Sequence, residues 1–369
     1  MHILITGGAG FIGSHLADEL LRHGHRVRAL DNLWEQVHGA DAARPAYLNA
    51  DVELIRGDVR DPAAVHQALG GIDAVYHFAA AVGVGQSMYE VADYTSINNL
   101  GTATLLEALM THPVQRLVVA SSMSLYGEGL YRAPAGQIVA GTERAIEQLR
   151  AGEWELCDRD GQPLVPVPTT EEKPAALASV YALSKFDQER LCLMIGRAYG
   201  IPTVALRFFN VFGTRQALSN PYTGVLAIFA SRLLNGNQPL IFEDGLQRRD
   251  FVSVYDVAQA CRLALESEAA VGRALNIGSG HAYSVLDVSA LLCGVLGTTI
   301  EPDICGKYRV GDIRHCFADI SAARSVLGYE PRVTLEDGIV ELAGWLEGQV
   351  ANDRVAEARA ELAVRGLTV

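Results

Sequence analysis

The 369-residue chain contains no run of about 18 uninterrupted apolar residues, so the sequence predicts no membrane-spanning helix. The first residues, Met1-His2-Ile3-Leu4-Ile5-Thr6, contain neither the basic segment nor the longer apolar segment of a secretory signal. We therefore expect a cytoplasmic protein. The six cysteines form no Cys-x-x-Cys pair and no His/Cys cluster at zinc spacing. This pattern predicts reduced thiols and no metal site.

Positive charge is also scarce, because 30 Lys and Arg residues stand against 43 Asp and Glu residues and leave a net charge of −13. Sequence-independent binding of nucleic acid needs a basic surface, so we expect no nucleic-acid partner. An anionic ligand would have to be held by a few local cations. Glycine is plentiful and aperiodic, with 36 residues, which indicates tight turns or a nucleotide-binding loop.

The first half of the chain alternates apolar runs with amphipathic segments. We interpret as buried strands the runs 3–6, 27–31, 52–58, 74–79, 117–122 and 203–208. Between the first two, Ile12, Leu16 and Leu20 recur every four residues and predict a helix closed by Gly24. The alternation predicts an α/β fold with a Rossmann-type doubly wound parallel sheet.

The pattern changes at three places. Residues 128–178 contain five prolines and several glycines and are interpreted as an insertion, mostly loop, in which 143–149 is compatible with a short helix. Strands become sparse after about residue 209. We therefore expect a Rossmann domain over 1–207 and a smaller mixed α/β substrate-binding domain over 208–345. A helical tail is expected over 346–369, in which 353–364 is rich in Ala, Glu and Arg and is predicted to be a solvated helix.

A glycine-rich turn follows the first predicted strand. Gly7, Gly10 and Gly13 let the backbone turn sharply and approach a pyrophosphate, and the helix that begins there supplies unpaired N–H groups. Asp31 ends the second predicted strand, near the distance of about 20 residues expected for the ribose-binding acid. Its carboxylate would accept hydrogen bonds from ribose hydroxyls and repel a 2′-phosphate. The motif favours NAD over NADP.

Further motifs extend this pattern into a family resemblance. The spacing Gly-x-x-Gly-x-x-Gly, with Asp58-Val59, His77-Phe78-Ala79-Ala80 and Asn98-x-x-Gly-Thr, resembles the extended short-chain dehydrogenases/reductases. Within them the chain resembles the NAD-dependent nucleotide-sugar epimerase/dehydratase family over roughly residues 1–345. The resemblance implies a cofactor site formed by Gly7, Gly10, Phe11, Ile12, Gly13, Asp31, Asn32, Asp58, Val59, Phe78, Ala79, Ala80, Asn98, Ser121, Tyr181, Lys185 and Phe208.

The resemblance also implies three catalytic residues. Tyr181 and Lys185 are spaced i, i+4 and would share one helix face. The family carries a catalytic Ser or Thr four residues before a Tyr-Gly pair, which places Ser122 in that role. Tyr181 would take a proton from a sugar hydroxyl while a hydride passes to NAD, and Lys185 would hold the nicotinamide ribose and lower the pKa of Tyr181. Return of the hydride to the other face of the ketone would give an epimer.

Met123 and Ser124 narrow the reaction. Related 4,6-dehydratases carry an Asp-Glu pair there, and the decarboxylases carry a Glu at the position of Ser124. Because a 4-epimerase needs no second acid, epimerisation is the preferred interpretation. A decarboxylase, a net oxidoreductase and a non-catalytic NAD-binding protein remain alternatives, the last disfavoured because the three catalytic residues are retained.

On the substrate side, Asn210, Arg249 and the Arg309-x-Gly-Asp312 motif resemble the family's nucleotide-diphosphate site. The two guanidinium groups would fork onto the pyrophosphate and Asp312 would contact the ribose. Segments 154–158 and 219–225 resemble bacterial dTDP-L-rhamnose 4-epimerases, which interconvert dTDP-L-rhamnose and dTDP-6-deoxy-L-talose. UDP-galactose 4-epimerase activity remains the main alternative.

The resemblance implies substrate contacts from Val82, Ser122, Ser124, Asn210, Arg249, Arg309 and Asp312. An apolar Val82 is compatible with a 6-deoxy sugar. Extended members of the superfamily usually pair two helices per subunit, so we expect a homodimer through helices 101–110 and 179–199.

Overall fold

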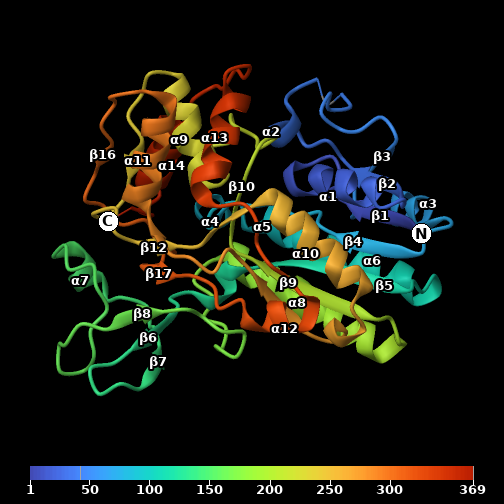
Figure 1. The fold of residues 1–369 in the computed structure, drawn as a ribbon, viewed down its shortest axis with the longest axis horizontal. Helices are drawn as coiled ribbons and strands as arrows, with labels where there is room; N and C mark the ends of the chain where they lie inside the picture. The colour runs from blue at the N-terminus through green and yellow to red at the C-terminus, as the bar shows by residue number, and fades with distance from the viewer. Residues whose placement is uncertain (42, 369) are drawn as a thin grey trace.

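The computed structural model describes residues 1–41 and 43–368. Its centre is a seven-stranded sheet in the order β14-β9-β5-β4-β1-β2-β3, with every neighbouring pair parallel (Figure 1). The strands are β1 (His2–Thr6), β2 (Arg26–Asp31), β3 (Glu53–Arg56), β4 (Ala74–His77), β5 (Arg116–Ser122), β9 (Thr203–Phe208) and β14 (Ala274–Ile277). The predicted α/β class with a parallel Rossmann-type sheet is confirmed.

Helices cover both faces of the sheet because side chains alternate along each buried strand. Ile3 and Ile5 of β1 belong to the hydrophobic cluster that contains α1 and α10 residues, whereas Leu4 belongs to the cluster of the opposite face. One face carries α1 (Phe11–Arg22), α10 (Val254–Glu266) and α12 (Ser321–Leu327). The other carries α3 (Pro62–Leu69), α6 (Gly101–Thr111) and α8 (Val180–Tyr199).

A second layer stands beyond the carboxyl ends of these strands, at the upper left of Figure 1. Its helices α9 (Val225–Leu234), α11 (Val285–Leu296) and α13 (Leu335–Leu346) share a hydrophobic cluster of their own. Short strands also form three small sheets separate from the central one: β10 (Asn210–Phe212) with β13 (Phe251–Ser253), β11 (Leu240–Ile241) with β16 (Asp303–Ile304), and β12 (Arg248–Arg249) with β15 (Tyr283–Ser284) and β17 (His315–Cys316).

The chain passes between the two layers more than once. β14, α10 and α12 lie beyond residue 207, yet β14 pairs with β9 and both helices pack on the large sheet. The predicted domain limits of 1–207 and 208–345 stay a prediction. The predicted boundary was based on strands becoming sparse after about residue 209, and that pattern does not show that later elements of the chain pack on the large sheet again.

The insertion is more regular than the sequence predicts. It contains a three-stranded antiparallel sheet in the order β7-β6-β8, made by β6 (Leu130–Arg132), β7 (Ile138–Ala140) and β8 (Val165–Val167), and the helix α7 (Ile146–Arg150). Figure 1 shows it in green at the lower left, projecting from the rest of the chain. Strands of three residues are too short to produce a readable alternation, which is why the sequence indicated loop.

The tail forms the predicted helix, α14 (Val355–Val364), but the prediction that it is solvated is wrong on one face. Val355, Ala358 and Leu362 are buried at spacing i, i+3, i+7. After the helix, the backbone N–H of Val310 donates to the carbonyl of Leu367 at 3.0 Å. Three apolar residues, one of them only an Ala, give a weak helical periodicity. The buried face was therefore not predicted, and the polar composition of the segment indicated a solvated helix.

The remaining elements are short: α2 (Glu35–His38), α4 (Val84–Ser87), α5 (Val91–Tyr94), the π-helix η1 (Thr95–Leu100) and the 3-10 helices η2 (Met123–Tyr126) and η3 (Glu268–Ala270).

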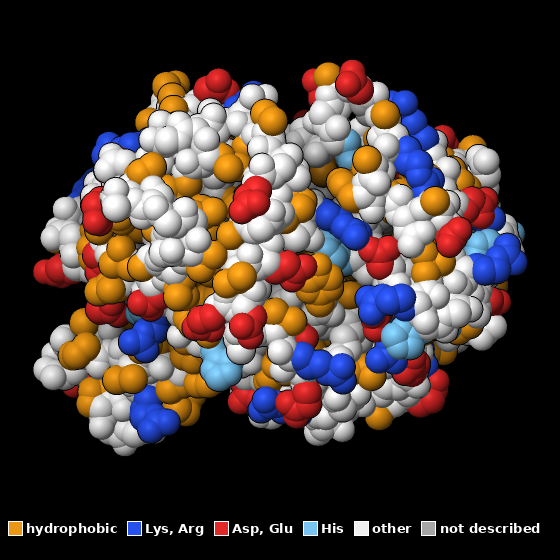
Figure 2. Space-filling view, turned by 45° about the horizontal axis from the view of Figure 1, so that its top comes forward, with side chains coloured by type: hydrophobic (Ala, Val, Ile, Leu, Met, Phe, Trp, Pro, Cys, Tyr) orange, Lys and Arg blue, Asp and Glu red, His pale blue; other side chains and the backbone are white. Residues whose placement is uncertain are grey.

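Across the described residues, the helices are all too short or too polar to reach from one side of a bilayer to the other. On the face shown in Figure 2, acidic and basic side chains are interspersed without a broad basic patch.

Candidate active site

A cavity of about 600 Å³ runs along the carboxyl ends of the central strands, between the sheet and the second layer. This edge is where ligands bind in open α/β sheets. Every residue that the sequence predicts for the cofactor and substrate sites lines the cavity, with the exception of Asn98. Its walls also include α14 residues, which the sequence did not predict.

The glycine turn has the shape that a bound pyrophosphate needs. Gly7 has φ +72°, and a Cβ added there would lie 2.9 Å from the backbone nitrogen of Ala79. A Cβ on Gly13 would lie 2.4 Å from the carbonyl oxygen of Gly7. Gly10 is the N-cap of α1 and offers no side chain to cap the helix, which leaves the first N–H groups of α1 for an anion. The turn therefore fits a dinucleotide.

Two carboxylates, those of Asp31 and Asp58, line the same wall of the cavity as the glycine turn. Asp31 is buried at the end of β2 and accepts hydrogen bonds from the N–H groups of Ala9 at 3.0 Å and Leu33 at 2.9 Å. Those bonds fix its carboxylate beside the glycine turn. Asp58 accepts from both edges of the Arg60 guanidinium at 2.9 and 2.7 Å, and this pairing holds the pKa of Asp58 below its usual value. Asp58 is therefore ionised at neutral pH, and hydrogen bonds hold both carboxylates in position.

Asn98 does not line the cavity, contrary to the direct cofactor contact that the resemblance implied. It is fully buried in η1, where its Oδ1 accepts from the N–H of Ala81 at 2.8 Å and its Nδ2 donates to the Ala81 carbonyl at 3.1 Å and to the Ser184 hydroxyl at 2.8 Å. Two of these bonds fix Ala81 in the loop after β4, and the third reaches Ser184 of α8. Asn98 thus supports the cavity wall from behind.

The three predicted catalytic residues, Ser122, Tyr181 and Lys185, all line the cavity. Ser122 ends β5, and Ser124 donates a hydrogen bond to its hydroxyl at 2.8 Å. Tyr181 stands in the first turn of α8, which Ser179 caps by accepting from the N–H of Ala182. Burial raises the pKa of the Tyr181 phenol above its usual value, and hydrogen bonding with the Ser122 side chain opposes part of that rise.

Lys185 lies one turn after Tyr181 and is almost fully buried. Burial lowers the pKa of its ammonium group to about 8. The ammonium donates to Oε1 of Gln188 at 2.6 Å, and Gln188 in turn donates to the Thr102 hydroxyl at 2.9 Å. Lys185 was predicted from the sequence, but Gln188 was not, because a single glutamine outside a known motif cannot be distinguished from a surface residue.

On the substrate side, Arg309 and Asp312 form a two-bond pair, with Nε and Nη2 of the arginine 3.0 and 2.8 Å from the carboxylate oxygens. The Asp312 carboxylate raises the pKa of Arg309, so the cation persists. Arg249 donates to the backbone carbonyls of Arg314 and Ile313, which fixes its guanidinium at the same end of the cavity. The two local cations that an acidic chain requires for an anionic ligand are therefore present.

Three amide side chains at this end carry unsatisfied buried oxygens. Oδ1 of Asn210 and the Oε1 atoms of Gln216 and Gln247 have no hydrogen-bond partner among the described residues, and all three residues line the cavity. A buried polar atom without a partner is costly, so each oxygen is a ready acceptor for a ligand donor. Only Asn210 was predicted from sequence; the two glutamines stand in no recognised motif.

Comparison with known proteins fits this geometry. The model of the NAD dependent epimerase/dehydratase family matches residues 3–278. The chain belongs to this family. A dTDP-L-rhamnose 4-epimerase of Burkholderia thailandensis is 37% identical over 93% of this chain and 94% of its own length. A UDP-glucose 4-epimerase of Corynebacterium glutamicum is 32% identical over 96% of this chain and 98% of its own length.

Solved structures of epimerases are similar over nearly the whole fold. The UDP-glucose 4-epimerase of Thermotoga maritima with UDP-glucose has a TM-score of 0.77 at 30% identity, covering 94% of this chain and 99% of that one. The UDP-glucuronic acid 4-epimerase of Bacillus cereus with UDP-glucuronic acid and NAD has a TM-score of 0.76 at 27% identity over the same shares. The predicted family, its NAD cofactor and an enzyme of the epimerase class are confirmed.

Proposed function

We propose that this family member interconverts dTDP-L-rhamnose and dTDP-6-deoxy-L-talose by epimerisation at C4. The observation that carries the reaction is the meeting of Ser122, Tyr181 and Lys185 at one cavity, next to Met123 and Ser124. Dehydration needs an acid to protonate its leaving group, and neither Met123 nor Ser124 supplies one. The choice of sugar is supported by the Burkholderia relative at 37% identity and by the apolar Val82, which lines the cavity with half its surface exposed.

The proton steps belong to this chain's own residues. Tyr181, as phenolate, accepts the proton of the C4 hydroxyl, and Ser122 hydrogen-bonds the same oxygen as it becomes a carbonyl. Lys185 stabilises the phenolate by its positive charge. NAD bound at the glycine turn would supply the hydride acceptor and donor. Rotation of the ketosugar within the wide cavity then lets reduction occur from its other face.

The NAD-binding residues are proposed to be those of the glycine turn, Asp31 with Asn32, Asp58 with Val59, and the strand ends, all lining one wall. The nucleoside diphosphate is proposed to bind at Arg249, Arg309 and Asp312. Asn210 also lines the cavity, and its buried amide oxygen has no hydrogen-bond partner among the described residues. Both arginines can fork onto pyrophosphate oxygens.

The test is incubation of the purified protein with dTDP-L-rhamnose and, separately, with UDP-galactose, followed by NMR detection of the C4 epimer. We expect turnover of dTDP-L-rhamnose without added cofactor and without net formation of NADH. Turnover of UDP-galactose alone would favour the second candidate function, UDP-glucose/UDP-galactose 4-epimerase, which the Corynebacterium relative at 32% identity supports. Continuous consumption of NADH would contradict both.

The protein is also proposed to be a homodimer that pairs α6 and α8 with their copies. Leu183 and Met194 of α8 are 45% and 51% exposed, and Leu100, directly before α6, is 54% exposed. Apolar side chains gathered on one surface are typical of an interface. Sedimentation should give a dimer for the wild type and a monomer for Leu183→Glu/Met194→Glu; an unchanged dimer would place the interface elsewhere.

A further inference from the structure

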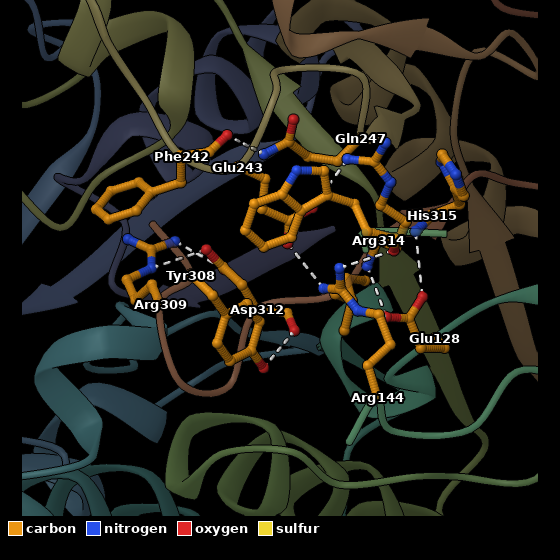
Figure 3. Close-up of polar contacts among 12 residues, drawn as sticks. Glu128, Arg144, Phe242, Glu243, Gln247, Tyr308, Arg309, Asp312, Arg314 and His315 are labelled. Carbon is orange, nitrogen blue, oxygen red and sulfur yellow. Dashed lines mark hydrogen bonds and ion pairs between the residues drawn. The ribbon is translucent and has the colours of Figure 1, made fainter. Parts of the chain in front are cut away.

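The part of the cavity lined by Arg249, Arg309 and Asp312 is called here the nucleotide end, because the nucleoside diphosphate is proposed to bind there. The insertion meets this end through a cluster of charged side chains (Figure 3). Arg314 has no exposed surface, and the side chains of Arg144 and Glu243 are each 2% exposed. Charges this deeply buried are retained only when they are paired. The insertion cluster consists of Glu128, Arg144 and Glu155 from the insertion and Glu243, Asp244, Arg314 and His315 from the second layer.

Glu243 stands at the centre of the insertion cluster. Its Oε1 accepts from Nη2 of Arg144 at 2.8 Å and its Oε2 accepts from Nη1 of Arg314 at 2.9 Å. The backbone of Glu243 has φ +54°, in the left-handed region that residues other than glycine rarely adopt. Two buried guanidinium groups therefore hold this residue in a conformation that it would otherwise leave.

The conformation of Glu243 sets the position of its neighbour Phe242, which lines the cavity. The Arg309 guanidinium carbon lies 5.5 Å from the centre of the Phe242 ring, and Figure 3 shows the two side chains facing one another. Arg309 is in turn paired with Asp312. A change of backbone at 243 would therefore move the aromatic wall against which the Arg309–Asp312 pair rests.

Arg144 reaches the same pair by a second route. Its guanidinium carbon lies 5.2 Å from the centre of the Tyr308 ring, and the Tyr308 hydroxyl donates to the Asp312 carbonyl at 3.0 Å. Its Nη1 donates to the Trp154 carbonyl at 3.1 Å within the insertion. One insertion side chain thus braces both segments, 242–243 and 308–312, that carry the nucleotide end of the cavity.

The charge balance makes Arg144 more than a packing contact. The insertion cluster holds four carboxylates, those of Glu128, Glu155, Glu243 and Asp244, against two guanidinium groups. Without Arg144 the excess negative charge would rise beside the cations Arg309 and Arg249. It would repel an incoming pyrophosphate and compete with it for those cations.

We propose that Arg144 is a positioning residue for the nucleoside diphosphate, which it serves by fixing Phe242 and the Arg309–Asp312 pair. The insertion is then part of the substrate site, although it lies outside the Rossmann sheet. This inference rests on the proposed function, because it assumes that a nucleoside diphosphate binds at Arg309.

The test compares Arg144→Met with the double variant Arg144→Met/Glu243→Gln, which removes both charges and so avoids a buried unpaired carboxylate. Arg150→Met is the matched control, since Arg150 is an exposed arginine of the same insertion. Titration calorimetry with dTDP and with UDP gives the nucleotide affinity, and bound NAD is measured on the released cofactor. Steady-state kinetics with dTDP-L-rhamnose separates KM from kcat.

We expect the double variant, which keeps the charge balance of the wild type but loses the contacts of Arg144, to bind dTDP and UDP about tenfold more weakly, the change that about 1.4 kcal/mol produces, with KM raised by a similar factor and kcat changed less. Arg144→Met also increases the carboxylate excess and should bind nucleotide at least as weakly as the double variant. Bound NAD should equal that of the wild type and of Arg150→Met. The inference is overturned if the double variant binds nucleotide within about twofold of the wild type, or if NAD is lost in parallel, which would indicate general unfolding. Failure of the wild type to bind either nucleotide would instead overturn the proposed function.

Discussion

The two ends of the cavity are constructed differently. At the end with the glycine turn, where NAD is proposed to bind, the wall comes from strand ends and turns between Gly7 and Ser122, each positioned by contacts with its neighbours in the sheet. At the other end, where the nucleoside diphosphate is proposed to bind, the wall comes from 210–225, 240–249, 309–313 and 355–362, with the insertion behind it. The first end is held by backbone geometry and the second by side chains that meet across long sequence separations, which makes the second more sensitive to single charge changes.

The largest effect is expected at the junction of the two ends, from Tyr181→Phe. Loss of the phenol removes the group that accepts and returns the proton, and general acid–base catalysis contributes about 10²- to 10⁴-fold. The ring remains, so its edge-to-face contact with Tyr94, at 6.4 Å between centroids, is retained. Turnover measured by NMR should therefore fall by that factor while NAD content and nucleotide affinity stay at wild-type values. Near-normal turnover would show that another group is the base.

A smaller effect, confined to the nucleotide end, is expected from Leu362→Asp. Leu362 is 4% exposed and lies with Arg309 near Gly85, where a Cβ would be 3.4 Å from Leu362 and 3.7 Å from Cδ of Arg309. A carboxylate there would compete with the pyrophosphate for Arg309, raising KM about tenfold, equivalent to about 1.4 kcal/mol. NAD content should not change.

The matched control on α14 is Val364→Asp, because Val364 is 84% exposed on the same helix. It adds the same charge to the tail without reaching the cavity wall. Equal KM values for the two variants would mean that α14 does not contribute to substrate binding at the nucleotide end of the cavity.

The cofactor end was predictable from the sequence because each of its residues belongs to a local pattern. Gly7 and Gly13 are required by backbone contacts shorter than a Cβ allows, and a Cβ on Gly10 would lie 3.3 Å from the carbonyl oxygen of Gly7, so the spacing of the three glycines predicts the turn. Asp31 and Ser122 stand at the ends of apolar runs, and the end of a parallel strand places a side chain at the site. Asn98 is the exception, since the same motif supports the wall through Ala81 instead of lining it.

The nucleotide end was predictable only where a family motif covered it. Arg249 and Arg309 were found in this way, but Gln216, Gln247 and Leu362 stand in no pattern, and the pairing of Arg144 with Glu243 joins residues 99 positions apart. β14 was not predicted for a related reason. It is a strand of only four residues, and the chain passes through the second layer before β14 pairs with β9. Contacts of this kind depend on the finished fold, which local periodicity does not describe.

The smallest effect is expected from acid. Glu155 has its pKa lowered from 4.5 to about 2 by hydrogen bonds from His315 and Arg314. A carboxylate whose folded pKa is depressed contributes stability that is present above its unfolded pKa and is lost as the pH falls through the folded value. The stability difference between the wild type and Glu155→Gln should therefore shrink as the pH falls from about 4.5 to about 2.

Urea unfolding midpoints across that pH range provide the measurement, with Glu153→Gln as the control because Glu153 is exposed in the same insertion. The side chain of Glu155 is 45% exposed, so solvent screening keeps the effect modest. A difference that is independent of pH would mean that Glu155 does not hold the insertion by its charge. Only the Arg144 variants would then support the claim that charged side chains hold the nucleotide end of the cavity.

The central claim, transient oxidation at C4 by tightly held NAD, is tested most directly by turnover of dTDP-L-rhamnose in D₂O. A hydride that passes from C4 to the cofactor and back does not exchange with solvent, whereas a proton removed and returned by a side chain does. The account predicts a C4 epimer that retains hydrogen at C4, with no sustained absorbance from NADH. Deuterium at C4, or NADH that accumulates with turnover, would contradict it.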